Sequence, residues 1–529
     1  MPKRKGRATP EAPALFFKLD RKKPLAQQIC GRVRAAIMER RLLAGERLAS
    51  VRGFAQTLEV SVDTVLAAYR SLADEGFIVP RRGAGFFVCD LGAAEGLIRP
   101  PGHERRSAPH SASEPGGPQP LNSARQPSEE ILRRTEHARR SVVAEYRSAV
   151  RSPLQTYASG MECIAEKHYL RFAAQLARSP WLHSSYSDPQ GYLPLRHAVC
   201  RRLRRSQGIS IDPARVVITT GLVQGLSLLA EVLFSPSDVV WVENPGYPTV
   251  WETLEYRGLT AAAVPTDAEG INVRQALAQA PNARGVFVST ASQYPLGAAL
   301  SEARGAELLD WAQRTGGWIV EDGTDGAISL GGRPYRSLFQ ASGAAECVAY
   351  VESFSLLIAP GIRAGYIVLP EAFAEVCAAA KYLTDRTTNE STQALLAEFL
   401  DSDVYESFLR RLNRRASEAF NIRRYRQRYD ALCAAVHERL APFGALLPAE
   451  YGCHAAFVLK SPISDAALSG ALAGEGIRVR PLSMCCRGEV NVRGLLLGFG
   501  TTGEEQIREA VGRIAAHCER LARTHSSGR

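Results

Sequence analysis

The sequence predicts two folded units joined by a linker: a small helical unit that ends in a β-hairpin, and a large α/β unit with a mostly parallel sheet. The length of 529 residues favours more than one unit, because domains usually hold about 100–200 residues. Near the N-terminus, three apolar stripes at helical spacing precede two short apolar strands. After residue 153, strands that look buried alternate with helical stretches, which is typical of parallel sheets with crossover helices.

Composition and charge narrow the class of protein. Hydrophobic residues make up 45% of the chain and charged residues 22%, as in ordinary globular proteins. Residues 1–153 carry the whole formal net charge of +11, and residues 154–529 sum to zero. A basic front and a neutral back indicate a polyanion partner for the front alone, although a solubilising tail accounts for the same charge.

The cysteines and the N-terminus predict a cytoplasmic protein. The 11 cysteines are scattered, and the neighbours Cys485 and Cys486 lack the spacing of metal ligands, so no metal site is expected. No apolar run approaches the roughly 20 residues that span a membrane, and no membrane contact is expected. The first residues are basic, unlike the apolar core of a signal peptide.

Four segments follow from these patterns. Residues 1–13 are predicted to form a disordered basic tail, and residues 14–90 the small unit. Residues 91–152 form the linker, because Pro, Gly, Ser and His gather between Pro100 and Pro120. Its last part, residues 128–151, has the composition of a charged helix. Residues 153–529 form the large unit.

Three helices are predicted in the small unit. The first carries the apolar stripe Leu25, Ile29, Val33 and Ile37, and the second and third span residues 51–58 and 62–72. Only Glu59 to Ser61 separate the last two helices, which is the tight join of a helix-turn-helix. The Ser61 side chain is expected to cap the third helix.

A hairpin follows the third helix. Two apolar strands, residues 77–79 and 86–88, flank a glycine-rich tip that holds Arg81, Arg82 and Gly83. Arginines at such a tip suit a phosphate backbone or a minor groove, which predicts a nucleic-acid partner.

Residues 24–89 resemble the winged helix-turn-helix of the GntR family of regulators. The resemblance rests on Pro24-Leu25, Gly45–Leu48, Arg52, Thr64-Val65, Tyr69, Leu72, Glu75-Gly76 and the Arg-Gly-x-Gly wing. It implies double-stranded DNA as a partner, bound by Arg52, Ser61, Thr64, Arg81, Arg82 and Gly83. Two positions depart from the family. Val62 replaces its usual arginine, and Asp63 suits a helix N-terminus but repels phosphates.

A second series of motifs runs through the large unit. In chain order they are Tyr186–Arg196, Thr219–Gly221, Glu243–Pro248, Gln293–Gly297, Glu321-Asp322, Ser353–Leu356 and Arg363–Tyr366. In order and spacing they resemble fold-type I aminotransferases, over about residues 157–520. With the small unit in front, they resemble the MocR subfamily of GntR regulators. The resemblance implies a homodimer and pyridoxal phosphate as the cofactor.

The resemblance also implies which residues surround that cofactor. They are Tyr186, Gly221, Tyr247, Tyr294, Asp322, Ser353, Ser355 and Arg363. Arg363 and the helix start at Gly221 suit the phosphate, and Asp322 suits the pyridine nitrogen. Tyr186 would reach into the partner subunit's pocket. Plainer roles stay open: Asp322 as a loop cap, Arg363 paired with Glu352 or Asp322, and Tyr247 as core packing.

The lysine that forms the Schiff base in the family is replaced by Leu356, so no catalytic residue is predicted. Beyond residue 154 the only lysines are Lys167, Lys381 and Lys460, and Lys381 is expected to be a solvated side chain on a helix. Further family groups are replaced at Leu222, Val223, Thr324 and Leu496. The pocket is therefore predicted to hold pyridoxal phosphate non-covalently at best, or no cofactor.

Three functions fit these patterns. The favoured one is a DNA-binding regulator whose large unit dimerises and senses a small effector. An active aminotransferase with a DNA-binding appendage is disfavoured, because transamination needs the lysine as covalent anchor and as base. The third is a scaffold whose large unit only dimerises.

Overall fold

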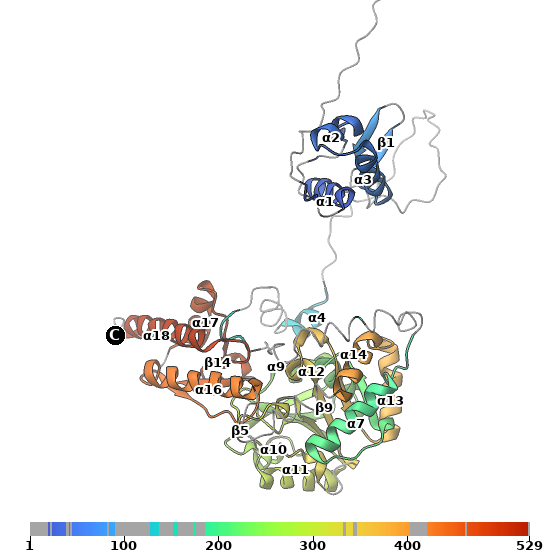
Figure 1. The fold of residues 1–529 in the computed structure, drawn as a ribbon. Helices are drawn as coiled ribbons and strands as arrows, with labels where there is room; N and C mark the ends of the chain where they lie inside the picture. The colour runs from blue at the N-terminus through green and yellow to red at the C-terminus, as the bar shows by residue number, and fades with distance from the viewer. Residues whose placement is uncertain are drawn as a thin grey trace, which may run out of the picture. The chain divides into compact units, whose positions relative to one another are not determined.

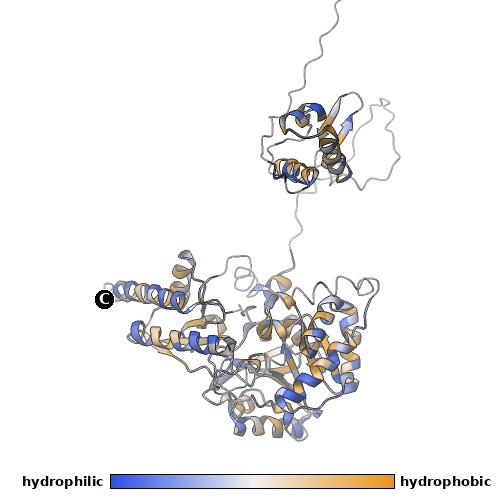
Figure 2. Ribbon diagram, in the orientation of Figure 1, coloured by the Kyte–Doolittle hydropathy of each residue, from blue (hydrophilic) through white to orange (hydrophobic). Residues whose placement is uncertain are grey.

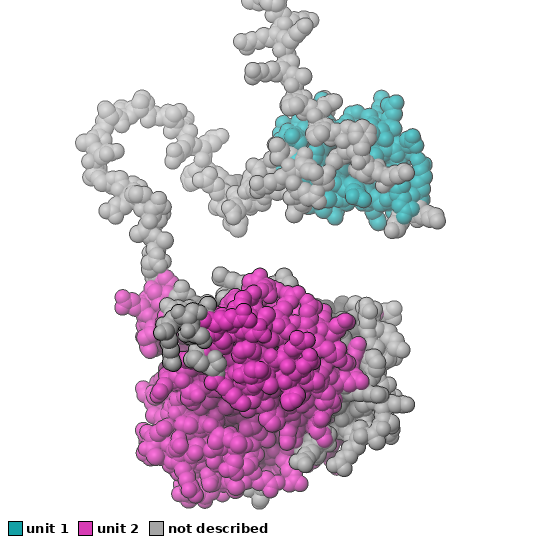
Figure 3. All heavy atoms as spheres, turned by 90° about the vertical axis from the view of Figure 1, so that its left-hand side faces the viewer, with its two compact units in different colours: residues 1–123 teal, residues 124–529 magenta. Residues whose placement is uncertain are grey.

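The computed structural model describes residues 19–21, 24–38, 42, 45–81, 84–89, 127–136, 152–156, 174, 186–331, 335–341, 346–402, 420–460 and 463–526. The chain divides into two compact units, residues 1–123 and 124–529, which Figure 3 colours separately. The predicted basic tail, most of the predicted linker, and the wing residues Arg82 and Gly83 lie outside the described residues.

The smaller unit contains three helices and a hairpin. They are α1 (Leu25–Met38), α2 (Val51–Thr57), α3 (Val62–Asp74), β1 (Ile78–Arg81) and β2 (Gly85–Val88), and the two strands are antiparallel. The caps fix where the helices begin: Ser50 accepts a hydrogen bond from the Gly53 amide, and Ser61 accepts one from the Thr64 amide, both at 3.1 Å. The predicted helix-turn-helix with a β-hairpin wing is confirmed.

Tyr69 holds the smaller unit together. Its ring is buried against Phe54 of α2 and Phe86 of the hairpin, with ring centroids 6.1 Å and 5.1 Å away. Its hydroxyl donates to the Ala49 carbonyl at 3.1 Å, so the buried polar atom is satisfied. One side chain thereby fixes α3 against both α2 and the wing.

The larger unit is built on an eight-stranded sheet (Figure 1). In spatial order its strands are β3 (Val216–Thr219), β10 (Gly365–Val368), β9 (Val348–Ser353), β8 (Trp318–Asp322), β7 (Gly285–Ser289), β4 (Val239–Asn244), β5 (Thr260–Asp267) and β6 (Gly270–Ile271). Strands β5, β4, β7, β8 and β9 pair in parallel, whereas β10 is antiparallel to both neighbours. The predicted, mostly parallel sheet is confirmed.

Helices cover both faces of this sheet. One face carries α7 (Leu193–Gln207), α10 (Val273–Gln279), α11 (Glu302–Thr315) and α14 (Glu390–Asp401); the other carries α8 (Leu222–Leu233), α9 (Pro248–Tyr256) and α13 (Glu371–Thr384). Because successive strand residues point to opposite faces, Ile218 packs into the first core and Val217 into the second. Figure 2 shows the hydrophobic strands inside and hydrophilic positions along the outer helices.

The C-terminal part adds a four-stranded antiparallel sheet in the order β11 (Gly444–Leu446), β12 (His454–Leu459), β14 (Gly494–Gly498), β13 (Arg480–Pro481). Helices α16 (Phe420–Arg439) and α18 (Glu504–Ser526) lie side by side (Figure 1), and α17 (Asp465–Gly474) packs on α18. Short elements complete the unit: α4 (Glu129–Arg134), α12 (Phe354–Leu357), η5 (Pro213–Arg215), η6 (Thr324–Ala327), η7 (Leu338–Gln340), η9 (Pro360–Ile362) and η10 (Leu482–Cys485).

Two expectations about single elements change in the structure. Within the segment predicted to be a charged helix, α4 covers Glu129–Arg134, and residues 137–151 lie outside the described residues. Lys381 was expected in solvent, but its side chain is fully buried in α13 and donates to Asp385 at 2.6 Å. The hydrogen-bonded carboxylate of Asp385 offsets part of the cost of burying this ammonium. Among the described residues, no helix has the length and apolar composition needed to cross a bilayer.

Candidate functional site

The start of helix α3 is open to solvent. Besides accepting from the Thr64 amide, the Ser61 hydroxyl lies 2.7 Å from the Thr64 hydroxyl. Val62 is 45% exposed, which is unusual for a valine, and Asp63 is exposed beside it. Both departures from the GntR pattern therefore face outward at the position where a helix-turn-helix meets its partner.

Two arginines flank this helix start in the sequence. Arg52 is exposed in the first turn of α2. Arg81 is exposed at the end of β1 next to the wing's tip, and its guanidinium lies 4.4 Å from the Phe87 ring centroid. Neither forms an ion pair within the described part of the chain. Their charges thus remain available to an anionic partner.

The larger unit contains a cavity of about 1020 Å³ at the ends of its central strands. Residues that follow β4, β7 and β8 line it, which is where parallel α/β sheets bind ligands. Six of the residues predicted around a cofactor line this cavity: Tyr247, Tyr294, Asp322, Ser353, Ser355 and Arg363. Gly221 adjoins the lining residue Leu222, and Tyr186 is not part of the lining.

One region of the cavity has the donors that an anion requires. A Cβ built on Gly221 would lie 3.1 Å from Nη2 of Arg363, so the absence of a side chain lets the guanidinium approach. Gly221 has a φ of 119°, and α8 begins after it without a side-chain cap. Ser353 and Ser355 add hydroxyls 3.0 Å apart. These groups fit the phosphate of pyridoxal phosphate.

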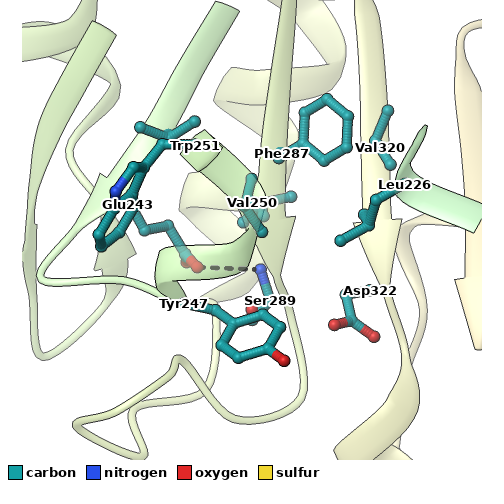
Figure 4. A pocket seen from close by; sticks show the side chains of 11 residues that line it. Leu226, Glu243, Tyr247, Val250, Trp251, Phe287, Ser289, Val320 and Asp322 are labelled. Carbon is teal, nitrogen blue, oxygen red and sulfur yellow. Dashed lines mark hydrogen bonds between the residues drawn. The ribbon is translucent and has the colours of Figure 1, made fainter. Parts of the chain in front are cut away.

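A second region is acidic. Burial raises the pKa of the Asp322 carboxyl to about 7, although the Thr324 amide donates to it at 2.9 Å. Burial also raises the pKa of Asp325 to about 7, and that of Glu243 to about 8. Figure 4 shows Asp322 and Tyr247 near Ser289, with Glu243 directed at the Ser289 amide. The Asp322 carboxyl suits the pyridine nitrogen of the cofactor, because its carboxylate form would accept a hydrogen bond from the protonated nitrogen.

No lysine amine is found among the described residues that line the cavity between the phosphate-binding and acidic regions. Leu356, in α12, lines the cavity and packs against the hydrophobic core of the C-terminal part. The replaced positions Leu222, Val223 and Thr324 also line the cavity, whereas Leu496 is fully buried beside Tyr294. No described lysine lines the cavity: Lys381 is paired with Asp385, Lys460 is exposed, and Lys167 lies outside the described residues.

The structure decides between several plainer roles. Asp322 does cap its loop through the Thr324 amide, while its carboxyl still lines the cavity. Arg363 forms no ion pair with described residues, and Glu352 pairs instead with Arg202 at 2.5 Å. The pairing of Arg363 with Glu352 or Asp322, one of the plainer roles left open by the sequence, is therefore wrong. Tyr247 packs edge-on against Tyr294, with ring centroids 5.2 Å apart, and lines the cavity as well.

Tyr186 is 76% exposed on the surface of the unit. The Arg386 guanidinium lies 4.8 Å from its ring centroid, and Tyr382 and Leu383 of the adjoining α13 region are 49% and 83% exposed. These side chains form an exposed apolar patch, which marks interaction surfaces in soluble proteins.

Some lining residues carried no sequence signal. Arg134, the last residue of α4, and the C-cap Thr135 lie far from the motifs in sequence, yet both line the cavity. Arg134 donates to the Tyr256 carbonyl at 3.5 Å. His454 lines it from β12, and nothing in its surroundings marked it. Asp325 could have been found, because it follows Asp322 by three residues on the same turn. Among the described residues, no cluster suits a metal ion.

Comparison with known families divides the chain as the motifs do. The family described as "Aminotransferase class I and II" matches residues 167–514, and "Bacterial regulatory proteins, gntR family" matches residues 25–88. The probable rhizopine catabolism regulatory protein MocR of Rhizobium meliloti is 26% identical over 92% of this chain and 92% of its own length. The pyridoxine biosynthesis transcriptional regulator PdxR of Corynebacterium glutamicum is 27% identical, over 92% and 94%.

Solved structures of aminotransferases share the fold of the larger unit. Kynurenine aminotransferase of Pyrococcus horikoshii superposes with a TM-score of 0.67 at 21% identity, over 76% of this chain and 98% of the enzyme. The α-aminoadipate aminotransferase LysN of Thermus thermophilus, complexed with N-(5'-phosphopyridoxyl)-L-leucine, gives 0.65 at 23% identity, over 74% and 98%. The resemblances predicted from the motifs are confirmed.

Proposed function

Since the chain belongs to the class I and II aminotransferase family and carries a GntR-family domain in front, we propose that it is a DNA-binding transcription regulator of the MocR type. Its larger unit binds a small effector without covalent attachment. The single observation that carries the second part is Leu356, an aliphatic side chain lining a cavity whose other groups suit a phosphorylated pyridine. Carbon–nitrogen bond formation needs an amine at that position, so the domain senses rather than catalyses.

Pyridoxal phosphate is the first candidate ligand. Arg363, Ser353, Ser355 and the start of α8 would hold its phosphate, and Asp322 would hold its ring nitrogen. When bound to an enzyme's lysine, the group serves as an electron sink. Here the same residues would retain it through hydrogen bonds and charge alone.

The smaller unit is proposed to bind double-stranded DNA through the exposed starts of α2 and α3 and through the wing. Arg52 and Arg81 would contact phosphates, and Ser61 and Thr64 would lie at the helix start that enters the groove. The wing residues Arg82 and Gly83 are proposed for the same surface from the sequence pattern. The +11 charge of residues 1–153 supports this assignment.

A homodimer is proposed on the exposed patch around Tyr186. A tyrosine that is 76% exposed, with Tyr382 and Leu383 nearby, would be buried by a second copy of the chain. Two copies would present two small units, which suits an operator with paired half-sites.

Binding of an effector in the cavity could also be coupled to the position of the linker. Helix α4 lies within the predicted linker, residues 91–152, and Arg134 of this helix and its C-cap Thr135 line the cavity. An effector that contacts these residues would favour one position of α4, and thereby one arrangement of the linker's end. This supplies a physical route from the cavity to the DNA-binding unit.

DNA binding is tested by selecting duplexes from a randomised library with the full-length protein and measuring affinity by fluorescence anisotropy at several salt concentrations. We expect affinity to fall steeply with salt, and Arg52→Ala to weaken binding by on the order of tenfold. Arg314→Ala is the control, because Arg314 is exposed on α11 of the larger unit. Selection without enrichment, or equal affinities of the two variants, would overturn the proposed DNA surface.

A further inference from the structure

The outward face at the start of helix α3 is poor in hydrogen-bond donors. The side chains of this helix that pack into the core of the smaller unit are Val65, Ala68, Tyr69 and Leu72. Besides the cap partner Thr64, the first two turns leave at or near the surface Val62, Asp63, Leu66 and Ala67. These four side chains offer three apolar surfaces and one carboxylate, and none of them carries an N–H or O–H donor.

The nearest hydroxyls are engaged in capping the helix. Ser61 accepts from the Thr64 amide at 3.1 Å, and the hydroxyls of the two residues lie 2.7 Å apart, so one of them donates to the other. Arg70 is exposed on the same helix, but it lies about two turns after Val62. The start of α3 therefore presents mainly acceptor and apolar atoms to its partner.

Such a surface distinguishes between the bases of DNA. In the major groove guanine presents two acceptors, whereas cytosine presents an amino donor and thymine a methyl group. A carboxylate can accept from the cytosine amino group but is repelled by the acceptors of guanine. Adenine presents one donor and one acceptor, which suits an amide better than a carboxylate. An exposed valine suits the thymine methyl group.

We propose that Val62 and Asp63 read two neighbouring pyrimidines in each half-site of the operator. Val62 contacts the methyl group of a thymine, and Asp63 accepts a hydrogen bond from the amino group of an adjacent cytosine. The inference rests on the proposed DNA-binding function, because it concerns the same surface. Both residues lie in the first turn of α3, where a helix-turn-helix reaches the base edges.

The exposure and charge of the two side chains support this assignment. Val62 is 45% exposed, which leaves its methyl groups open to a partner, and Asp63 forms no ion pair with described residues. The Asp63 carboxylate opposes the phosphates of any duplex, while the exposed Arg52 and Arg81 attract them. A repulsion that is present at every sequence, and is offset only at a matching base, raises discrimination between sequences.

Uracil in place of thymine tests the contact of Val62, because it removes only the methyl group. Duplexes selected from a randomised library by the full-length protein give the half-site. Fluorescence anisotropy at one salt concentration then compares this duplex with duplexes that carry uracil at each thymine in turn. We expect uracil at one thymine to weaken wild-type binding about fourfold for each half-site. In Val62→Ala the same replacement should have a smaller effect, and the double-mutant cycle isolates the contact.

Asp63→Asn and Asp74→Asn are the matched variants for the cytosine contact. Asp74 is exposed at the last residue of α3, away from the helix start. Beside the thymine, we expect wild type and Asp74→Asn to prefer cytosine to adenine by about tenfold. Asparagine suits adenine, so Asp63→Asn should reverse this preference. It should also bind an unrelated duplex more tightly than wild type, because the repulsion of phosphates is lost.

The outcomes separate base recognition from DNA binding itself. Selection without enrichment would overturn the proposed DNA surface, and this inference with it. An enriched half-site without thymine, or one in which no uracil weakens wild-type binding, would overturn the contact of Val62; this comparison needs no variant to fold. A preference for cytosine that survives in Asp63→Asn would show that Asp63 only stabilises the helix start, and would overturn its part in recognition.

Discussion

The buried Lys381 ammonium of α13 and the carboxylate of Asp385, the C-cap residue of that helix, are joined by a hydrogen bond of 2.6 Å. The other carboxylate oxygen of Asp385 accepts from Gln224 at 2.7 Å, and Gln224 in turn accepts from the Thr220 amide at 2.7 Å. This chain of contacts ties α13 to the loop that precedes α8, where the proposed phosphate site begins. Lys381 therefore has a structural role, because it holds Asp385 in this chain of hydrogen bonds.

Removing one partner of this pair should destabilise the larger unit. Lys381→Met removes the charged hydrogen bond to Asp385, and a hydrogen bond to a charged group contributes about 1.5–3 kcal/mol. Chemical denaturation of the full-length protein measures the effect. Lys460→Met is the control, because Lys460 is exposed. Equal denaturation midpoints for the two variants would show that the pair is not structural.

The phosphate assignment makes a separate prediction for Arg363. Arg363→Gln removes the guanidinium beside Gly221, so affinity for pyridoxal phosphate should fall on the order of tenfold to a hundredfold. Affinity for pyridoxal, which has no phosphate, should hardly change. Titration calorimetry with both compounds checks this. An equal loss for both would mean that Arg363 maintains the cavity's shape and does not recognise the phosphate.

Much of this architecture could be predicted from the sequence. The spacing of Leu25, Ile29, Val33 and Ile37 located α1, and Ser61 marked the start of α3 because capping is a local effect. The glycine and arginine motifs at strand ends predicted the place of the cavity, because the carboxyl ends of parallel strands lie together at one edge of the sheet.

What escaped prediction depends on contacts between distant segments. Lys381 looked solvated, because its partner Asp385 and the packing of α13 on α8 do not appear in a periodic pattern. His454 and Arg480 meet Tyr294 only through the pairing of β12, β13 and β14. Arg134 reaches the cavity from a helix that precedes the first motif by about 50 residues.

The acidic region predicts how stability changes with pH. Burial raises the pKa of Asp322 from 3.8 to about 7, so the folded state favours its protonated form. Its contribution to stability is complete below about pH 4 and is lost as the pH rises through 7. Between about pH 4 and about pH 8, the wild-type protein should lose roughly 2–4 kcal/mol of unfolding free energy through ionisation of Asp322. Asp322→Asn, whose amide does not titrate, should not show this loss. Denaturation midpoints across this range give the comparison. Parallel pH profiles for the two proteins would contradict the buried, protonated carboxyl.

Position 356 offers a gain-of-function experiment. Because Leu356 lines the cavity near the phosphate and pyridine sites, Leu356→Lys would place an amine where pyridoxal phosphate presents its aldehyde. After incubation with pyridoxal phosphate and reduction with borohydride, we expect the variant to retain the cofactor on residue 356. Ser329→Lys, outside the cavity lining, is the control for unspecific labelling.

The same treatment of the wild-type chain tests the central claim most directly, with intact-mass and peptide mass spectrometry as the readout. A regulator without the lysine should bind pyridoxal phosphate reversibly and return to its unmodified mass, with no stoichiometric adduct on any lysine. One cofactor fixed per chain, mapped to a single lysine, would contradict the account.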